Sequence, residues 1–277
     1  MTVLQSIVLG LIQGLTEFLP ISSSAHLALI PYLAGWSNIP ADQRFVFDVL
    51  VQLGTLLAVI VYFWKDLYKI IGAVISGLLH KKPFATPEAR LGWYIVLATI
   101  PALIAGLLFK KRVEEFFGDP KSIAILMIVT AGLLYAAERF GKRTLQLSQL
   151  DWKGALWMGA FQALAIFPGV SRSGATISGG MLRSYDRPSA ARFSFLMSIP
   201  IMLAASAAAA SNLAAVNNLS SFLPVLLVGF IIAAISGFLV IHWLLRFLAH
   251  RPLHVFIIYR VVFGLLAYLL LSLNLFG

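Results

Sequence analysis

The stretch Gln13-Gly-Leu-Thr-Glu17-Phe-Leu-Pro20-Ile-Ser22-Ser23-Ser24-Ala-His26 is polar, although apolar runs at 9–12 and 27–30 flank it. It contains one acid, three consecutive hydroxyls and one imidazole. A proline interrupts a helix, and serines that follow it favour a new helix start. We therefore predict two half-helices that enter a membrane and turn back near Pro20–Ser24. A single kinked spanning helix is the alternative.

The composition of the whole chain favours a membrane protein. Of its 277 residues, 60% are hydrophobic and 12% are charged, whereas soluble domains carry about 25% charged residues. Apolar stretches near the length that a bilayer requires occur at 45–64, 91–109, 122–137, 192–210, 222–245 and 254–273. We predict an all-α polytopic membrane protein with about six transmembrane helices, forming a single integral-membrane domain over residues 1–277.

Composition also excludes several classes of function. The chain has no cysteine, which excludes disulfides and thiolate metal sites. Its net charge is +10, but the basic residues are scattered between spans, so we expect no nucleic-acid binding. The N-terminal residues have no basic start and no small-residue cleavage site, so we expect no signal peptide. The positive charge can instead attract anionic membrane lipid.

A second polar interruption, Phe167-Pro168-Gly-Val-Ser171-Arg172-Ser173-Gly174-Ala-Thr176, lies within the apolar segment 154–183. Laid over each other without gaps, 10–24 and 159–173 match at six positions, including Gln13 with Gln162 and Ser22 with Ser171. Three predicted spans separate the interruptions, so the second should enter from the opposite face. We predict two re-entrant helical hairpins in an inverted-topology repeat, which meet near the midplane. Repeat one covers about 1–140 and repeat two about 150–277.

Basic residues predict the orientation, because short cytoplasmic loops are rich in Lys and Arg. Those on one predicted side are Lys65, Lys69, Lys81, Lys82, Arg90, Arg139, Lys142, Arg143, Lys153, Arg246 and Arg251. With that side cytoplasmic, both termini, the loop 35–44 and the first hairpin face outward. We expect an amphipathic interfacial segment at 65–80, a charged segment at 110–121 and a polar loop at 211–221.

The second interruption offers an anion site. Hydroxyls and free backbone N–H groups at a helix start favour anions, and Arg172 adds a forked donor suited to phosphate. We expect Ser171, Ser173 and Thr176 to bind phosphate beside Arg172. The alternative is a helix cap together with an arginine that pairs with a carboxylate such as Glu17.

The first interruption offers groups for catalysis. Glu17 can act as a general acid or base, or as a ligand of a divalent cation. Ser22, Ser23 and Ser24 supply hydroxyls for nucleophilic attack or phosphate binding, and we expect Ser22 and Ser24 to bind phosphate. A helix after Pro20 would place His26 on one face with Ser22 and Ser23. Such a hydroxyl can be activated as a nucleophile, and His26 itself can accept a phosphoryl group. The alternatives are a core histidine bonded to a backbone carbonyl, and serines that are small for close helix packing.

Four further polar residues, Gln13, Gln162, Asp48 and Gln52, are expected to support the site. For Arg260, inside the last span, we expect a pair with a buried acid or a side chain that snorkels to the surface. The remaining histidines show no metal-ligand spacing, and no nucleotide-binding motif is present. An acid, hydroxyls, an imidazole and a guanidinium that converge at membrane depth predict phosphoryl chemistry on a substrate with a lipid tail.

The two motifs resemble the signatures of the undecaprenyl-diphosphate phosphatase family, and the likeness extends through 47–57 to the end of the chain. The resemblance implies a multi-pass enzyme of the bacterial inner membrane whose site opens to the periplasm. It would hydrolyse undecaprenyl diphosphate to undecaprenyl phosphate and inorganic phosphate, recycling the lipid carrier for cell-wall synthesis and conferring bacitracin resistance. It assigns catalysis to Glu17, Ser23, His26 and Arg172, and leaves open whether Ser23, His26 or water attacks.

Some features stay open at this stage. Many family members have Glu where this chain has Gln13, which argues against a metal site built on two acids. The resemblance leaves a requirement for Mg²⁺ or Ca²⁺ open, with Glu17 as the residue for any metal. The sequence also allows a homodimer. Inverted repeats with broken helices are a transporter architecture, so the competing function is a polyprenyl-phosphate flippase that hydrolyses nothing.

Overall fold

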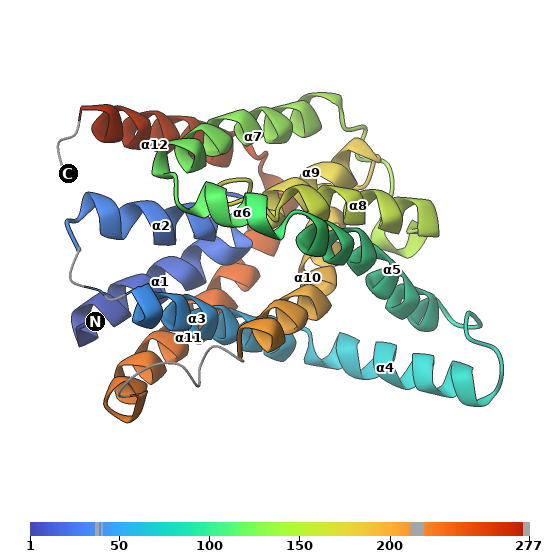
Figure 1. Cartoon of the computed structure of the whole chain (residues 1–277). Helices are drawn as coiled ribbons and strands as arrows, with labels where there is room; N and C mark the ends of the chain where they lie inside the picture. Colours follow the sequence, from blue (N-terminus) through green and yellow to red (C-terminus); the bar gives the residue numbers. More distant parts are fainter. Residues whose placement is uncertain (37–38, 40, 211–218, 274–277) are drawn as a thin grey trace.

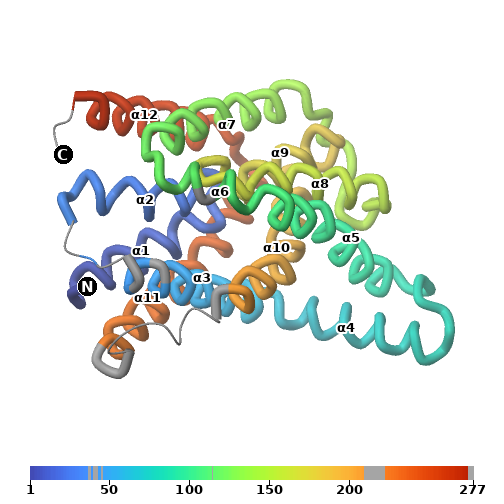
Figure 2. The backbone as a smooth tube through the Cα atoms, in the orientation of Figure 1, coloured from blue at the N-terminus to red at the C-terminus, as the bar shows by residue number. Residues whose placement is uncertain are grey.

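The structure is a computed structural model that describes residues 1–36, 39, 41–210 and 219–273. The helices of this part are α1 (Val3–Phe18), α2 (Ser23–Leu33), α3 (Ala41–Tyr62), α4 (Trp64–Leu79), α5 (Pro87–Leu108), α6 (Lys110–Phe117), α7 (Pro120–Phe140), the short 3₁₀ helix η1 (Leu147–Gln149), α8 (Trp152–Leu164), α9 (Arg172–Leu182), α10 (Arg187–Ala210), α11 (Leu219–His250) and α12 (His254–Ser272). Figures 1 and 2 show the N-terminus and the end of α12 at one end of the bundle, and the turn between α4 and α5 at the other.

Among the described residues, five helices are long and apolar enough to cross a membrane, namely α5, α7, α10, α11 and α12. A sixth apolar arm is the segment Val46–Tyr62 of α3, which continues into α4 across a bend of 77°. The prediction of an all-α membrane protein with about six spans is confirmed. The amphipathic segment predicted at 65–80 forms α4.

Several helix ends differ from the predicted ones. The span predicted at 91–109 begins earlier, at Pro87, because Thr86 caps the helix and a proline fits its first turn. Likewise α10 begins at Arg187 and α11 continues to His250, since helices continue through polar residues that a hydropathy pattern excludes. The charged segment at 110–121 contains a helix, α6. Residues 211–218 of the loop predicted at 211–221 lie outside the described residues, as do 37, 38 and 40 of the loop predicted at 35–44.

The two interruptions form re-entrant hairpins. In Figure 1, α1 and α2 run side by side from one end of the bundle to its middle and back, and α8 and α9 do so from the opposite end. The serines that begin the second arms have nearly the same left-handed backbone, with φ 75° and ψ 93° at Ser22 and φ 69° and ψ 111° at Ser171. The inverted repeat is confirmed, and the alternative of one kinked spanning helix is wrong.

Matched glycines let the two repeats interlock. A Cβ atom at Gly10 in α1 would lie 2.6 Å from the carbonyl oxygen of Gly229 in α11. A Cβ atom at the equivalent Gly159 in α8 would lie 2.5 Å from the carbonyl oxygen of Ala98 in α5. Only a residue without Cβ allows such close backbone approach. The first arm of each hairpin therefore packs against a helix of the other repeat.

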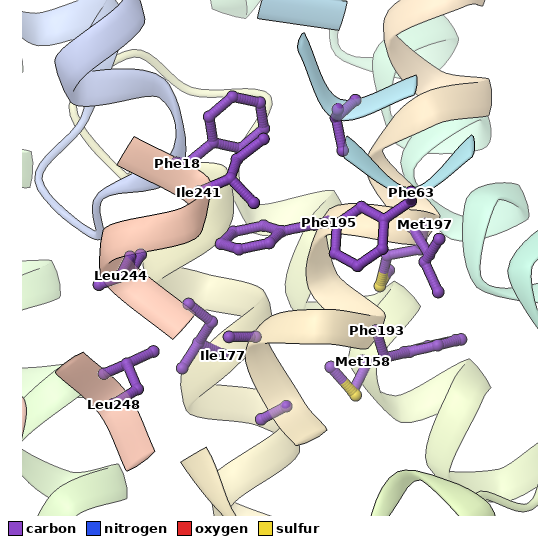
Figure 3. Close-up of a cluster of buried hydrophobic side chains, with 14 of the residues drawn as sticks. Phe18, Phe63, Met158, Ile177, Phe193, Phe195, Met197, Ile241, Leu244 and Leu248 are labelled. Atoms are coloured by element: carbon purple, nitrogen blue, oxygen red, sulfur yellow. The ribbon is translucent and has the colours of Figure 1, made fainter. Parts of the chain in front are cut away.

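Phe18, at the end of α1, belongs to a large buried cluster of hydrophobic side chains (Figure 3). Phe18, the last residue of α1, is fully buried and packs edge-on against Phe195 of α10, with ring centroids 5.3 Å apart. Phe63, Phe193 and Ile241 belong to the same buried cluster. The first break therefore begins directly after Phe18, a residue held in the hydrophobic core.

A buried ion cluster joins three helices at the end of the bundle opposite the N-terminus. The side chain of Glu138 in α7 is 5% exposed and accepts a 2.7 Å hydrogen bond from Arg143. It also pairs with Arg187 of α10 and accepts a 3.2 Å bond from the backbone N–H of Leu253, where α12 begins. One carboxylate therefore holds α7, α10 and α12 together.

Replacing Glu138 with alanine should destabilise the fold by about 3–5 kcal/mol, because breaking a buried ion pair leaves its charges without partners. The free energy of unfolding can be measured by SDS titration of the protein in detergent micelles. Glu115→Ala is the matched control, since Glu115 pairs with Arg112 on the surface and exposed pairs contribute little. Equal stability of the two variants would contradict the role of Glu138.

Candidate active site

Glu17 is the centre of the polar cluster that the sequence predicts. It is 8% exposed. Its Oε1 accepts a 2.6 Å hydrogen bond from Nη2 of Arg172, and its Oε2 accepts bonds from Oγ of Ser23 at 2.5 Å and Nε2 of Gln13 at 3.0 Å. These donors come from α9, α2 and α1. The tips of the two hairpins therefore meet at one carboxylate.

Further hydrogen bonds join the two tips. Ser173 donates from Oγ to the carbonyl oxygen of Leu19 at 2.9 Å, and the backbone N–H of Gly169 donates to Oγ of Ser24 at 3.4 Å. Within each tip, the cap serine accepts a backbone N–H three residues on, at 3.4 Å for Ser22 and 3.1 Å for Ser171. Short side chains are needed for such bonds, which explains why serines fill both breaks.

The two tips share a scaffold but differ in chemistry. The gapless superposition of the repeats places Arg172 at the position of Ser23, and an isoleucine at the position of Glu17. Ser23 and Arg172 are each the first residue of their helix, and both contact Glu17. The first repeat thus contributes an acid and a hydroxyl, and the second contributes the guanidinium.

A cavity of about 620 Å³ begins at Glu17 and Ser23. Its walls come from α1, α2, α3 and the junction of α6 with α7. The lining residues are Gln13, Glu17, Ser23, Ser24, Leu27, Ala28, Tyr32, Arg44, Asp48, Val49, Gln52, Phe117 and Pro120. One part is polar and the other is apolar, so the cavity suits a phosphorylated head with the start of an apolar tail.

The predicted residue Arg172 lies behind Glu17, outside the lining of this cavity. Its side chain is 16% exposed. The ion pair of Arg172 with Glu17 is the contact expected if Arg172 only pairs with a buried carboxylate. The pair still allows Arg172 to bind substrate, because a phosphate can compete with Glu17 for the guanidinium.

His26 faces away from the cavity. Its Nδ1 lies 2.7 Å from the carbonyl oxygen of Ser22 and its Nε2 lies 2.6 Å from Oη of Tyr259. Because a carbonyl only accepts, Nδ1 donates, and in the neutral ring Nε2 accepts from Tyr259. The ring also stacks on Phe263 with centroids 4.6 Å apart. Both ring nitrogens therefore have hydrogen-bond partners, and these bonds link the start of α2 at Ser22 to Tyr259 of α12.

The other predicted residues divide into two groups. Asp48 and Gln52 line the cavity on α3, and Gln13 reaches both Glu17 and Thr55. In contrast, Ser171, Thr176 and Gln162 lie outside the cavity lining. Thr176 bonds to the backbone of Arg172 and to Ser194, while Gln162 bonds to the carbonyl of Ala98 at 3.4 Å. Whether any of these residues binds phosphate stays a prediction.

Sequence reasoning missed Arg44, which it placed in a loop. Arg44 lies in the first turns of α3 and lines the cavity. Its Nη2 donates to the carbonyl oxygens of Leu27 at 2.7 Å and Ala28 at 3.2 Å. Pro31 lies four residues after Leu27 and has no N–H to donate. A proline inside the half-helix was the signal that a donor from elsewhere was needed.

The expectations for Arg260 are wrong. Its side chain is fully buried, so it does not snorkel, and the described part of the chain offers it no carboxylate. It donates instead to backbone carbonyls of both breaks. Arginines inside spans are commonly functional, but carbonyl partners leave no trace in a sequence pattern.

Comparison with known proteins decides the family. A family model described as bacitracin resistance protein BacA matches residues 6–266. The chain belongs to the BacA family. An undecaprenyl-diphosphatase of Myxococcus xanthus is 43% identical over 98% of this chain and 90% of its own length. Proteins of the same name from Chlorobium phaeobacteroides and Chloroherpeton thalassium are 42% and 40% identical and are covered over 95% and 98% of their lengths. The predicted family resemblance is thereby confirmed, and the cluster around Glu17 is the polar centre of a BacA protein.

Proposed function

We propose that Glu17, Ser23 and Arg172 form the active site of an integral-membrane phosphatase. The enzyme hydrolyses undecaprenyl diphosphate to undecaprenyl phosphate and inorganic phosphate, as the names of its relatives indicate. This recycles the lipid carrier for cell-wall synthesis and confers bacitracin resistance. The observation that carries the site assignment is the single buried carboxylate that contacts a hydroxyl and a guanidinium at the end of a partly apolar cavity.

In the proposed reaction, Ser23 is the nucleophile. Its Oγ attacks the terminal phosphorus while Glu17, 2.5 Å away, takes the hydroxyl proton. The bond from that phosphorus to the bridging oxygen breaks, and undecaprenyl phosphate leaves with the electron pair. Glu17 passes the serine proton to the departing undecaprenyl phosphate and is ionised again. Water then attacks the phosphoserine and gives one proton to Glu17. The bond from phosphorus to Oγ of Ser23 breaks, Glu17 returns that proton to Oγ, and inorganic phosphate is released.

Charge stabilisation supplies most of the catalysis of phosphoryl transfer. Arg172 is placed to bind the diphosphate once the substrate competes with Glu17, and the N-termini of α2 and α9 add positive helix dipoles. His26 is proposed to position the turn at Ser22 rather than to attack, because both of its ring nitrogens already have partners.

The cavity offers a place where a divalent cation could bind together with the substrate. The described residues contain no group of three or more His, Asp or Glu side chains that could hold a metal ion. The cavity offers oxygen ligands from Asp48 and the amides of Gln13 and Gln52, and Mg²⁺ commonly binds to one or two carboxylates together with phosphate oxygens. We propose these residues as the place for Mg²⁺ or Ca²⁺, where such an ion would offset phosphate charge.

The proposed location is the bacterial inner membrane, with the cavity open to the periplasm. The membrane-spanning helices establish an integral membrane protein. Basic residues of the α4–α5 region and of the chain between α7 and α8 lie at the end away from the N-terminus, and the cytoplasmic side carries the excess of such residues. The cavity includes the end of α2 and the start of α3, which lie at the other end.

The test is an assay of purified protein in detergent with undecaprenyl diphosphate. We expect equal molar amounts of inorganic phosphate and undecaprenyl phosphate. The competing function is tested by measuring transport of polyprenyl phosphate in proteoliposomes. A flippase would move this lipid across the bilayer without releasing inorganic phosphate. Transport without any phosphate release would overturn the proposal.

A further inference from the structure

Arg260 in α12 is fully buried, and its guanidinium contacts three separate segments. Nε donates to the carbonyl oxygen of Met127 at 3.1 Å, and Nη1 donates to that of Pro20 at 3.2 Å. Nη2 donates to the carbonyl oxygens of Gly169 at 2.8 Å and Val170 at 3.2 Å, and also to Thr130. One side chain therefore bonds to the first break, the second break and α7.

The breaks need such a partner. Carbonyl groups at a helix end have no helical donor, and at membrane depth no bulk water replaces it. Pro20 lies in the first break, and Gly169 and Val170 lie in the second. Five N–H groups on a rigid planar fork can serve carbonyls that point from different directions, which the single ammonium of a lysine cannot do.

The neighbouring residue acts on the same tip. Tyr259 bonds to Nε2 of His26, whose Nδ1 bonds to the carbonyl of Ser22. Consecutive residues of α12 therefore hold the first tip at Pro20 and at Ser22. No residue of α12 belongs to the lining of the cavity, so these contacts set geometry without reaching the substrate.

We propose that Arg260 is a positioning residue, which holds the two hairpin tips in register so that Glu17 of one tip meets Arg172 of the other. This inference rests on the proposed active site. Glu17 and Arg172 belong to different repeats, so their separation depends on contacts between the tips. Ser173 bonds directly to Leu19 and Gly169 to Ser24. Among the described residues, Arg260 is the side chain that bonds to the backbone of both breaks from a third segment.

The experiment compares Arg260→Met and Arg260→Lys with wild type, and Arg246→Met, an exposed arginine of α11, is the control. Two readouts are measured on each protein. The first is kcat and KM for phosphate release. The second is the distance between spin labels at Leu15→Cys in α1 and Leu164→Cys in α8, both exposed positions. The chain has no cysteine of its own, so only these two sites are labelled.

For Arg260→Met, we expect kcat to fall about 100-fold with KM changed less than about threefold, since a displacement of about 1 Å can cost that much in rate. The distance distribution should broaden. Arg260→Lys keeps the charge, yet it should recover less than about a tenth of the lost rate and remain broad. Arg246→Met should match wild type in both readouts.

Wild-type kcat in Arg260→Met would overturn the inference, and so would a loss of kcat with an unchanged distance distribution, which would assign Arg260 a direct electrostatic effect. If Arg260→Met does not fold in detergent, the test relies on Arg260→Lys. Wild-type kcat and a narrow distance distribution in Arg260→Lys would then overturn the inference. Absence of phosphate release by wild type would reject the active site instead, while the distance measurement would still test the register.

Discussion

Arg172→Ala should lower kcat for undecaprenyl diphosphate by about 1,000-fold or more, the effect typical of removing an arginine that stabilises phosphoryl transfer. The variant loses the guanidinium that is placed to bind the diphosphate. It also leaves the buried carboxylate of Glu17 without its charged partner at 2.6 Å. Initial rates of phosphate release over a range of substrate concentrations measure the loss.

Two further variants make this result specific. Arg172→Lys keeps the charge but not the fork, so it should recover only a small part of the rate. Arg183→Ala removes an arginine at the other end of α9, where its side chain is 43% exposed and lies 4.0 Å from Asp151, and it should keep wild-type activity. Wild-type turnover in Arg172→Ala would show that the guanidinium is structural only.

Ser23→Ala should also abolish turnover, by about 1,000-fold or more, because removal of a nucleophile leaves only binding and charge stabilisation. Substrate labelled with ³²P in its terminal phosphate and quenched during turnover in SDS at neutral pH, where phosphoserine and phosphohistidine both survive, should leave label on Ser23 in the wild type and none on the variant. KM should change little, since Arg172 and the cavity remain.

The neighbouring hydroxyl is the control for this result. Ser24 also lines the cavity, but its Oγ accepts the N–H of Gly169 and does not contact Glu17. Ser24→Ala should therefore lose much less activity than Ser23→Ala. Label found on His26 would show that His26 is the nucleophile instead of Ser23. Substantial turnover by Ser23→Ala without any labelled protein would show that water attacks directly.

The hairpins could be predicted because their cause is local. Pro20 ends one helix, the serines cap the next, and the same pattern recurs at Ser171. Helix ends were less predictable, because a helix can continue through polar residues beyond its apolar part. For example, α11 continues through Arg246 to His250. The bend of 77° between α3 and α4 could not be predicted, because the sequence at the bend contains no proline or glycine.

The site divides in the same way. The meeting of Glu17 with Arg172 follows from the repeat, since residues at equivalent tips must come together. The direction of His26 depends on how α2 is rotated against α12, which no spacing within residues 13–26 fixes. The bonds of Arg260 reach carbonyls 240 and 90 residues away in the chain, and because carbonyls are present at every residue, they cannot be recognised in advance.

The close approach of Gly10 to Gly229, and of Gly159 to Ala98, has a consequence for biosynthesis. Each half of the polypeptide surrounds a hairpin that the other half must supply. While the ribosome has released only the N-terminal half, α5 has no α8 against it and α1 has no α11. The first hairpin must therefore wait in the membrane, with its polar tip incompletely covered, until the second is inserted.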